Sequence, residues 1–298
     1  MRILLLGGGG FIGKNLVHEF VQRNYSVTSL SRKEGNHPDV IYLTGDFNSI
    51  DWRSFSLNYD AVFLLVNPSH PRSLRREEEF GYFLNSTIKL CEALKNNPTR
   101  LIFFSSGGSI YGNVSRESAC EEDPLCPISS YGLQKKILET VLGFYREVHN
   151  VDSLVLRVSN PYGPYQNVQS GVGFISTLVH NTLNNKVTRI FGSGENIRDY
   201  IYIQDVVSVC QKSLFYTGRS RIFNVGSGIG YSIQDVVNTL KNSFLMSPKI
   251  VYEVHNIQDV RRSVLNVHHT EKELVWSPQV SLKEGMRRTI EHFKSQTI

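Results

Sequence analysis

A glycine-rich turn close to the start of the chain limits its possible folds more than any other feature. The apolar run 3–6 is followed at once by the sequence Gly-Gly-Gly-Gly-Phe-Ile-Gly over residues 7–13. A buried strand, a glycine-rich turn and a helix, in this order, let backbone N–H groups and the helix N-terminus approach a pyrophosphate. The sequence therefore predicts a dinucleotide-binding turn, whose contact residues we expect to be Gly7, Gly10, Phe11, Ile12 and Gly13.

Apolar segments recur through the first half of the chain with helical stretches between them. Most are apolar throughout rather than alternating, as expected for strands that are buried on both faces of a parallel sheet. The predicted strands are 3–6, 26–30, 40–43, 61–66, 100–104 and 153–157, and the predicted helices are 11–23, 72–96 and 130–149. Right-handed crossovers between such elements predict an α/β fold with a doubly wound parallel sheet and a ligand crevice at the carboxyl ends of the strands.

The second half of the chain is less regular. Gly- and Pro-rich loops occur around 161–173 and 192–196, and the segments that begin at Ser232 and Ser281 resemble helix N-terminal capping signals. We therefore predict a dinucleotide-binding domain over residues 1–160. Residues 161–298 are predicted to form a smaller, mixed α/β lobe that binds the substrate and does not fold independently.

A tyrosine and a lysine lie four residues apart in the segment Tyr-Gly-Leu-Gln-Lys at 131–135. Residues with this spacing share one face of a helix, so the ammonium group of Lys135 is expected to favour the phenolate of Tyr131 and to lower its pKa toward neutrality. Such a phenol suits general acid–base catalysis. With the glycine-rich turn upstream and a Ser-Ser-Gly-Gly strand end between them, this pair indicates a nicotinamide-dependent oxidoreductase.

Bulk composition argues against several other classes of protein. The 298 residues include 32 Lys and Arg against 27 Asp and Glu, a net charge of +5 that suits a phosphorylated substrate without forming a nucleic-acid patch. No apolar run approaches the roughly 18 residues that a membrane span needs, and no signal peptide is apparent. The four cysteines lack metal-site spacing. We expect a cytoplasmic protein with no metal site, no nucleic-acid partner and no membrane span.

Short motifs follow one another along nearly the whole chain. They are GGGGFIG at 7–13, SSGGSIYG at 105–112, the pair Tyr131 and Lys135, RVSNPYGP at 157–164, RDYIYI at 198–203, FNVGSG at 223–228, WSP at 276–278 and SLKEG at 281–285. In this order they resemble the extended short-chain dehydrogenases/reductases, which include nucleotide-sugar epimerases such as UDP-glucose 4-epimerase, dehydratases and 4-ketoreductases. The resemblance implies a Rossmann-type sheet, a nicotinamide cofactor and a nucleotide-diphosphate sugar as substrate, and we expect a homodimer.

The resemblance also implies roles for individual residues. Tyr131 matches the group that exchanges a proton with the sugar hydroxyl or keto oxygen, and Lys135 matches the residue that binds the nicotinamide ribose and holds the phenolate. Asp46 matches a residue near the adenine amino group. Asn160 matches the family residue that touches the substrate diphosphate or sugar, and Arg198 matches the phosphate-binding arginine.

One catalytic position departs from the family pattern. The family places a Ser or Thr four residues before the Tyr of a Tyr-Gly pair, where its hydroxyl bonds the reacting sugar oxygen, but this chain has Gly107 there. Ser106 and Ser109 flank that position and either can supply a hydroxyl, as can a backbone N–H group or a water molecule. We take Ser106 as the third catalytic residue and Ser109 as a substrate contact.

Two further departures concern the substrate and the reaction. A second phosphate-binding arginine is usual at the position that is Asn256 here, and Arg261 or Arg262 can compensate for it. Dehydratases of the family follow the catalytic hydroxyl residue with Asp-Glu, whereas this chain has Gly108 and Ser109. The sequence therefore disfavours the 4,6-dehydratase reaction.

The end of the second predicted strand bears on the choice between NAD and NADP. An acidic residue there would bind the ribose hydroxyls of NAD, but the chain has Ser31 and Arg32. A hydroxyl and a guanidinium group suit hydrogen bonding and ion pairing with a 2′-phosphate. The cofactor is therefore NAD or NADP, and these two residues favour NADP.

Three hypotheses for function follow. The first is a nucleotide-sugar epimerase that works through a 4-keto intermediate at C4 of the hexose, and the overall pattern of motifs favours it. The second is an NADPH-dependent 4-ketoreductase that makes a deoxyhexose, which the missing acidic residue on the second strand favours. The third is a non-catalytic NAD(P)-binding sensor, against which Tyr131 and Lys135 count. We place the epimerase first.

Overall fold

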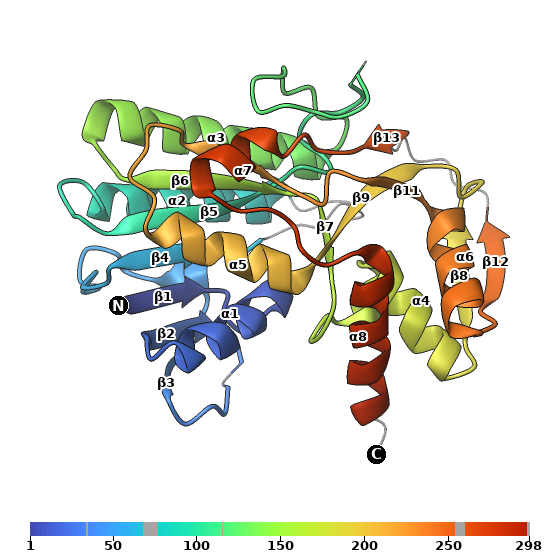
Figure 1. Cartoon of the computed structure of the whole chain (residues 1–298). Coiled ribbons are helices and arrows are strands. Elements are labelled where there is room, and N and C mark those ends of the chain that lie inside the picture. The colour runs from blue at the N-terminus through green and yellow to red at the C-terminus, as the bar shows by residue number, and fades with distance from the viewer. Residues whose placement is uncertain (34, 68–76, 115, 254–259, 297–298) are drawn as a thin grey trace.

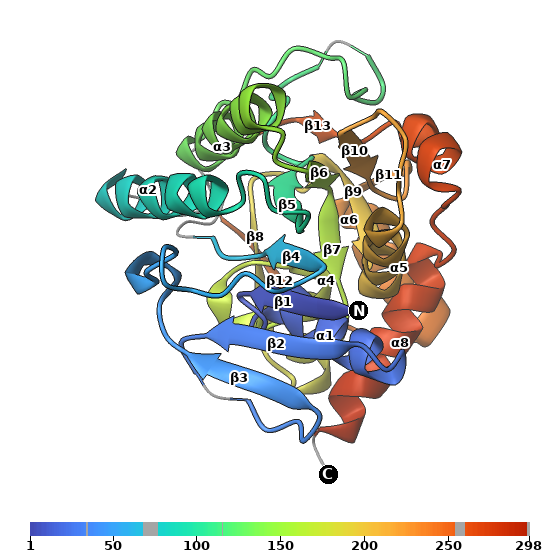
Figure 2. The same cartoon turned by 90° about the vertical axis from the view of Figure 1, so that its left-hand side faces the viewer.

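The structure, a computed structural model, describes residues 1–33, 35–67, 77–114, 116–253 and 260–296. Within these residues the chain forms a seven-stranded sheet whose strands are all parallel (Figure 1 and Figure 2). From one edge to the other its strands are β10 (Ile222–Val225), β6 (Ser153–Val158), β5 (Arg100–Ser106), β4 (Ala61–Leu64), β1 (Arg2–Leu6), β2 (Ser26–Ser31) and β3 (Val40–Thr44). The order reverses between β1 and β4, as in a doubly wound Rossmann sheet, so the predicted fold class is confirmed.

All six predicted strands are present in this sheet. Most of their bounds agree within one residue, while β4 ends at Leu64, two residues earlier than predicted, and β5 extends to Ser106. Residues 72–76 of the predicted helix 72–96 lie outside the described residues, and the remainder forms α2 (Glu77–Ala93). The seventh strand, β10, was not predicted, because its four residues lie in the irregular second half and become a strand by pairing with β6.

Helices cover both faces of the sheet. α1 (Phe11–Gln22) and α5 (Ile203–Leu214) lie on one face, and α2 and α3 (Ser130–His149) lie on the other (Figure 2). Side chains of β1 alternate between these layers. Ile3 and Leu5 pack in the same cluster as Phe20 of α1, whereas Leu4 and Leu6 pack with α2 and α3. The apolar runs therefore serve two hydrophobic layers at once.

The remaining elements form a smaller lobe beside the carboxyl ends of the large sheet (Figure 1). Its strands are β7 (Asn160–Tyr162), β8 (Val187–Phe191), β9 (Ile197–Tyr202), β11 (Gly230–Ser232), β12 (Lys249–Glu253) and β13 (Arg262–Ser263). Its helices are η2 (Val168–Ser170), which contacts α4 (Phe174–Leu183), together with α6 (Ile233–Phe244) and α8 (Leu282–Ser295). The short helices η1 (Phe47–Ser49) and α7 (His268–Leu274) lie elsewhere. Both predicted helix starts are confirmed: Ser232 forms a capping box with Asp235, and Ser281 accepts from the backbone N–H of Glu284.

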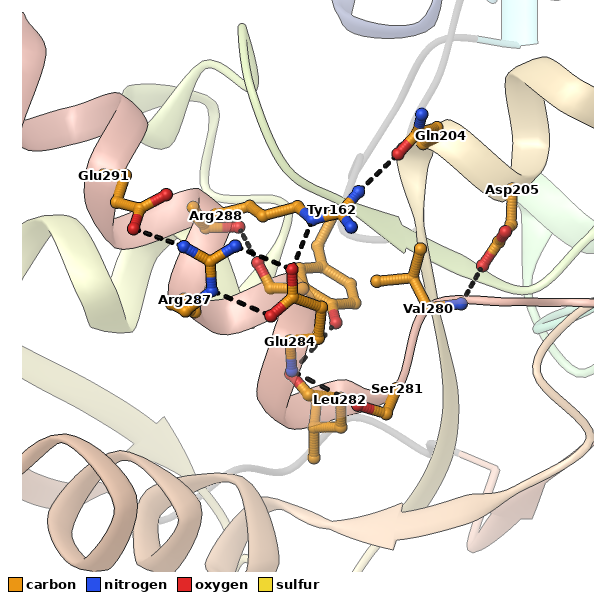
Figure 3. A network of polar contacts seen from close by, with 12 residues as sticks. Tyr162, Gln204, Asp205, Val280, Ser281, Leu282, Glu284, Arg287, Arg288 and Glu291 are labelled. Carbon is orange, nitrogen blue, oxygen red and sulfur yellow. Dashed lines mark hydrogen bonds and ion pairs between the residues drawn. The ribbon is translucent and has the colours of Figure 1, made fainter.

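Polar contacts fix the start of α8 against β7 and α5 (Figure 3). The hydroxyl of Tyr162 donates to the carbonyl of Leu282 at 3.3 Å. The carboxylate of Asp205, in the first turn of α5, accepts from the backbone N–H of Val280 at 3.0 Å. Because α5 covers the large sheet, these contacts tie the smaller lobe to it.

The two halves of the chain are interleaved. β10, α5 and α7 follow residue 160 in the sequence but pack in or against the large sheet. That residues 1–160 bind the cofactor and residues 161–298 bind the substrate stays a prediction.

In the described part of the chain, no helix has both the length and the apolar content that a membrane crossing requires. The cytoplasmic location also stays a prediction.

Candidate active site

The glycine-rich turn joins β1 to α1 and leaves little room for side chains. Gly7 has a φ of +96°, which favours glycine, and its N–H donates to the carbonyl of Leu30 at 2.8 Å. A Cβ atom on Gly13 would lie 2.5 Å from the Cα atom of Gly8, so only glycine lets α1 approach the turn this closely. Among the described residues, no side chain caps the start of α1 after Gly10, which leaves its first N–H groups available to an anion.

All five predicted turn residues are brought together by this geometry. Gly7 and Gly10 lie in the turn, and Phe11, Ile12 and Gly13 form the first turn of α1. The end of β4 closes one side, because the backbone N atom of Val66 lies 3.1 Å from the position of a Cβ on Gly7. The turn therefore adjoins the strand ends that carry the polar residues of the site.

The phenol of Tyr131 lies near the ends of two neighbouring strands. The side chain of Ser129 caps α3 by accepting from the N–H of Gly132 at 3.1 Å, which places Tyr131 in the first helical turn. Ser106 is the last residue of β5, and Asn67 follows β4. Hydrogen bonding with both of these side chains lowers the pKa of the phenol, but burial has a larger, opposite effect and the pKa of Tyr131 is raised.

Lys135 lies one turn further along α3 and is 4% exposed. Its Nζ atom donates to the carbonyl of Phe104 at 2.7 Å and lies 5.7 Å from the ring centroid of Tyr131. Burial lowers the pKa of Lys135 to about 7, while the negative charge of Glu139 acts in the opposite direction. The expectation that Lys135 lowers the pKa of Tyr131 toward neutrality is therefore wrong, because burial dominates the titration of both groups.

A buried ion pair lies next to Lys135. Glu139 of α3 and Arg157 of β6 have side chains that are 5% and 3% exposed, and the Nη2 atom of Arg157 lies 2.7 Å from Oε2 of Glu139. Ser105 of β5 donates to the same carboxylate, and Arg157 also donates to the hydroxyl of Tyr111 at 2.8 Å. The pair thus joins α3, β5 and β6 beside the candidate catalytic residues.

The residues expected at the adenosine end of a dinucleotide lie beside the glycine-rich turn. A Cβ on Gly9 would be 3.0 Å from Oγ of Ser31, and the N–H of Gly45 donates to the carbonyl of Ser31 at 3.0 Å. Arg32, which follows β2, is exposed. Asp46 is also exposed, and its carboxylate caps η1. Ser31, Arg32 and Asp46 therefore gather at the ends of β2 and β3.

The residues expected to bind the substrate lie on the other side of Tyr131. Asn160 begins β7, and its amide group donates to the carbonyl of Asp199 at 2.9 Å. A Cβ on Gly108 would lie 3.8 Å from the same amide, so Asn160 faces the residues that follow β5. Ser109 is half-buried in that segment. Arg198, on β9 next to Asp199, is half-buried and donates to the preceding carbonyl at 2.9 Å.

The structure describes only part of the segment that was expected to supply a second phosphate-binding residue. Asn256 lies outside the described residues. Arg261 is exposed, whereas Arg262 donates from Nε to the carbonyl of Glu117 at 2.8 Å. Across the residues that the structure does describe, no group of three or more His, Cys, Asp and Glu side chains is placed to hold a metal ion.

Two features of the site were not predicted from the sequence. Asn67 directly follows the predicted strand 61–66, at the carboxyl end where ligand contacts gather, and this position is the signal that identifies it. Glu139 continues the spacing of four that links Tyr131 and Lys135 on one helical face. That spacing shows which face Glu139 occupies, but its partner Arg157 lies on another element and is joined to it only by folding.

The family model described as "NAD dependent epimerase/dehydratase family" matches residues 3–226 of the chain. The chain belongs to this family. The resemblance seen in the sequence motifs is therefore confirmed, and this member of the family is an enzyme. The hypothesis of a non-catalytic sensor loses its support.

Several relatives match over nearly their full length. The dTDP-4-dehydro-6-deoxyglucose reductase of Escherichia coli is 31% identical over 98% of this chain and 97% of its own. A putative UDP-glucose 4-epimerase of Methanocaldococcus jannaschii is 28% identical over 98% of both chains. The UDP-glucose 4-epimerase of Thermotoga maritima, solved with UDP-glucose, has a TM-score of 0.92 and 30% identity with full coverage of both chains. The enzyme of that name from Thermus thermophilus, solved with NAD, has a TM-score of 0.89 and 27% identity over 99% of both chains.

We expect Glu139→Gln to lower the free energy of unfolding by about 3–5 kcal/mol, because it leaves the guanidinium of Arg157 buried without its counter-charge. Chemical denaturation measures the change. Glu147→Gln is the matched control, since Glu147 pairs with Arg146 while 73% exposed, and its loss is expected to cost less than about 1 kcal/mol. Equal effects of the two substitutions would contradict the importance of the buried pair.

Proposed function

We propose that this enzyme is a nucleotide-sugar epimerase that acts at C4 of the hexose through a 4-keto intermediate. The observation that carries the proposal is the convergence of Ser106, Tyr131 and Lys135 at the carboxyl end of β5, near the glycine-rich turn. A phenol, a hydroxyl and an ammonium group at one point can move a proton on and off a sugar oxygen. The UDP-glucose 4-epimerases among the relatives support the same reaction.

The residues around the turn fit a nicotinamide dinucleotide. Gly7 and Gly13 let the turn and the start of α1 pack closely together, and the uncapped start of α1 offers its N–H groups to a pyrophosphate. Ser31 and Asp46 would hold the adenosine end, and Tyr131 with Lys135 would hold the nicotinamide ribose. When bound, the nicotinamide ring supplies reversible two-electron oxidation and reduction of the sugar carbon.

The side chains of the site handle the proton and the charge. Tyr131, as phenolate, takes the proton of the C4 hydroxyl and later returns it to the keto oxygen. Ser106 donates a hydrogen bond to the same oxygen as its charge changes. Burial raises the pKa of Tyr131, and the hydrogen bonds with Ser106 and Asn67 act in the opposite direction, toward the phenolate.

A nucleotide-diphosphate sugar fits the groups on the opposite side of Tyr131. Arg198 is suited to a diphosphate oxygen, and Asn160 and Ser109 are suited to the sugar or the diphosphate. The net charge of +5 favours such an anionic ligand. Structures similar to this chain were solved with UDP-glucose and with UDP-glucuronic acid, which supports a UDP-sugar as the first substrate to test.

A 4-ketoreductase that uses NADPH is the second candidate. The exposed guanidinium of Arg32, which follows β2, offers a positive charge to a 2′-phosphate. The hydroxyl of Ser31 donates to the carbonyl of Lys33 in this structure and would have to turn to reach the phosphate. The 31% identity with the dTDP-4-dehydro-6-deoxyglucose reductase of Escherichia coli supports the same reaction class. The two candidates differ in whether the cofactor is consumed.

We expect Tyr131→Phe to lower kcat by roughly 100- to 10,000-fold with UDP-glucose or UDP-galactose, because the variant lacks the exchangeable phenolic proton. The cofactor should still bind, weakened only by the loss of the phenol's contact with the nicotinamide ribose, and equilibrium titration of NAD(H) measures it. Tyr82→Phe, at a 66% exposed tyrosine of α2, is the control. Near-normal turnover by Tyr131→Phe would remove the basis of the proposed active site.

Titration of both cofactors separates the two candidate reactions. If Arg32 binds a 2′-phosphate, Arg32→Ala weakens NADP(H) binding by at least about tenfold and leaves NAD(H) binding unchanged, since a charge-assisted hydrogen bond contributes about 1.5–3 kcal/mol. Lys33→Ala controls for the loss of any positive charge in this loop. A strong preference for NAD(H) that Arg32→Ala does not alter would exclude the NADPH-dependent reductase.

We also propose that the enzyme is a homodimer. One face of α3 carries Leu133, Phe144 and Val148, which are 50%, 52% and 57% exposed, with the half-buried Ile137 and Val141 between them. Their spacing forms a single apolar stripe along the helix. A contiguous exposed apolar stripe of this kind is typical of a protein–protein contact, and a second copy of the chain would cover it.

We expect the double substitution Phe144→Asp and Val148→Asp to convert the dimer to a monomer, because it places charges in the centre of that contact. Size-exclusion chromatography with light scattering measures the mass. Phe215→Asp is the control, since Phe215 is 63% exposed but lies after α5, away from the stripe. A wild-type protein that is monomeric at micromolar concentration would contradict the proposal.

A further inference from the structure

A leucine from the second half of the chain occupies the space in which a side chain at position 107 would lie. A Cβ atom on Gly107 would be 2.5 Å from Cδ1 of Leu265 and 2.9 Å from Cδ2. The carbonyl oxygen of Arg157 would be 3.0 Å away on another side. Position 107 is where the family pattern has a hydroxyl residue, and in this chain such a side chain would meet Leu265.

Leu265 cannot easily move to make room. It is 1% exposed and packs in a cluster with Ile110, Tyr111, Ala119 and Val267. Its backbone is fixed on both sides: its N–H donates to the buried carboxylate of Asp199 at 3.3 Å, and Ala119 forms a parallel bridge with it. The two residues next to Leu265 extend this bridge through backbone hydrogen bonds of 2.8 Å to Ala119.

The strand end at Ser106 and Gly107 is also held by hydrogen bonds. The N–H of Gly107 donates to the carbonyl of Val158 at 2.8 Å, and Ser106 is 7% exposed. The hydroxyl of Ser263, on β13 just before Leu265, donates to the carbonyl of Gly107 at 3.5 Å. Ser263 therefore contacts the carbonyl of Gly107, and Leu265 lies where a side chain at position 107 would begin.

We propose that Leu265 is a positioning residue of the active site: by filling the space beside Gly107 it excludes a hydroxyl there and holds the end of β5 so that Ser106 faces Tyr131. The inference rests on the proposed function for its catalytic consequence, but the packing between positions 107 and 265 is independent of it. The second half of the chain thereby determines which serine serves the site.

The packing is tested by a double-mutant cycle in thermal unfolding. Gly107→Ala should lower the Tm by about 2–6 °C, because it overpacks the contact with Leu265. Adding Leu265→Ala to Gly107→Ala should recover part of that loss, although Leu265→Ala alone is destabilising. Gly108→Ala is the matched control, since a Cβ there would have no neighbour closer than 3.8 Å. If the effects of the two substitutions simply add, the packing argument is overturned.

The positioning role is tested by moving the hydroxyl. Ser106→Ala should lower kcat about 100-fold, as expected when a hydrogen bond to the reacting oxygen is lost. Adding Gly107→Ser alone should restore nothing. Adding Gly107→Ser together with Leu265→Ala should restore kcat at least about tenfold, the effect of one regained hydrogen bond. The control combines Ser106→Ala, Gly107→Ser and Val267→Ala. It shortens another side chain of the same cluster but not the one beside position 107, so it should not restore kcat.

The outcomes separate the inference from the proposed function. Rescue by Gly107→Ser with Leu265 intact would overturn the positioning role, as would failure of rescue in a triple variant that folds with a Tm close to that of Ser106→Ala. A wild-type enzyme that converts no UDP-sugar, with either cofactor, would contradict the proposed function instead. In that case the double-mutant cycle of Gly107→Ala and Leu265→Ala, measured by thermal unfolding, still decides whether side chains at the two positions compete for one space.

Discussion

A carboxylate and a guanidinium group that are both nearly excluded from water depend on each other, because either charge left alone in the interior is strongly destabilising. In this enzyme they are Glu139 of α3 and Arg157 of β6. Arg157 donates to Tyr111, and Tyr111 donates in turn to the side chain of Asn224 in β10 at 2.6 Å. The network therefore extends from α3 to the edge of the large sheet. The positions of Tyr131 and Lys135 follow from it, since they precede Glu139 on the same face of α3.

The same carboxylate also acts on the charge of Lys135. Burial favours the neutral amine and brings the pKa of Lys135 to about 7, whereas the charge of Glu139 favours the ammonium form. The phenol of Tyr131 is subject to the same kind of balance, with burial opposed by hydrogen bonding with Ser106 and Asn67. Burial therefore brings Lys135 near the point where it changes protonation, whereas it favours the protonated phenol of Tyr131.

The residues predicted to bind the cofactor and those predicted to bind the substrate do not belong to separate units in space. β10 completes the large sheet, and α5 covers one of its faces, although both come from the second half of the chain. Leu265 packs against Gly107 at the end of β5, and Asn160 faces Gly108. The surroundings of Gly107 and Gly108, at the end of β5, are therefore formed jointly by both halves, and for this reason the second lobe is not expected to fold alone.

The sequence by itself determined the parts of this protein that depend on local pattern. The glycine turn at 7–13, the six apolar strands and the pairing of Tyr131 with Lys135 on one helical face all follow from spacing along the chain. Burial and long-range contact were decided by the tertiary structure. The sequence argument predicted a lowered pKa for Tyr131, and it was wrong because desolvation depends on neighbours that spacing does not reveal. The partner of Glu139, the strand β10 and the leucine that fills the space beside Gly107 come from 18 to 158 residues away. Periodicity specifies which face of an element is apolar, but which distant side chain meets that face depends on how the elements pack.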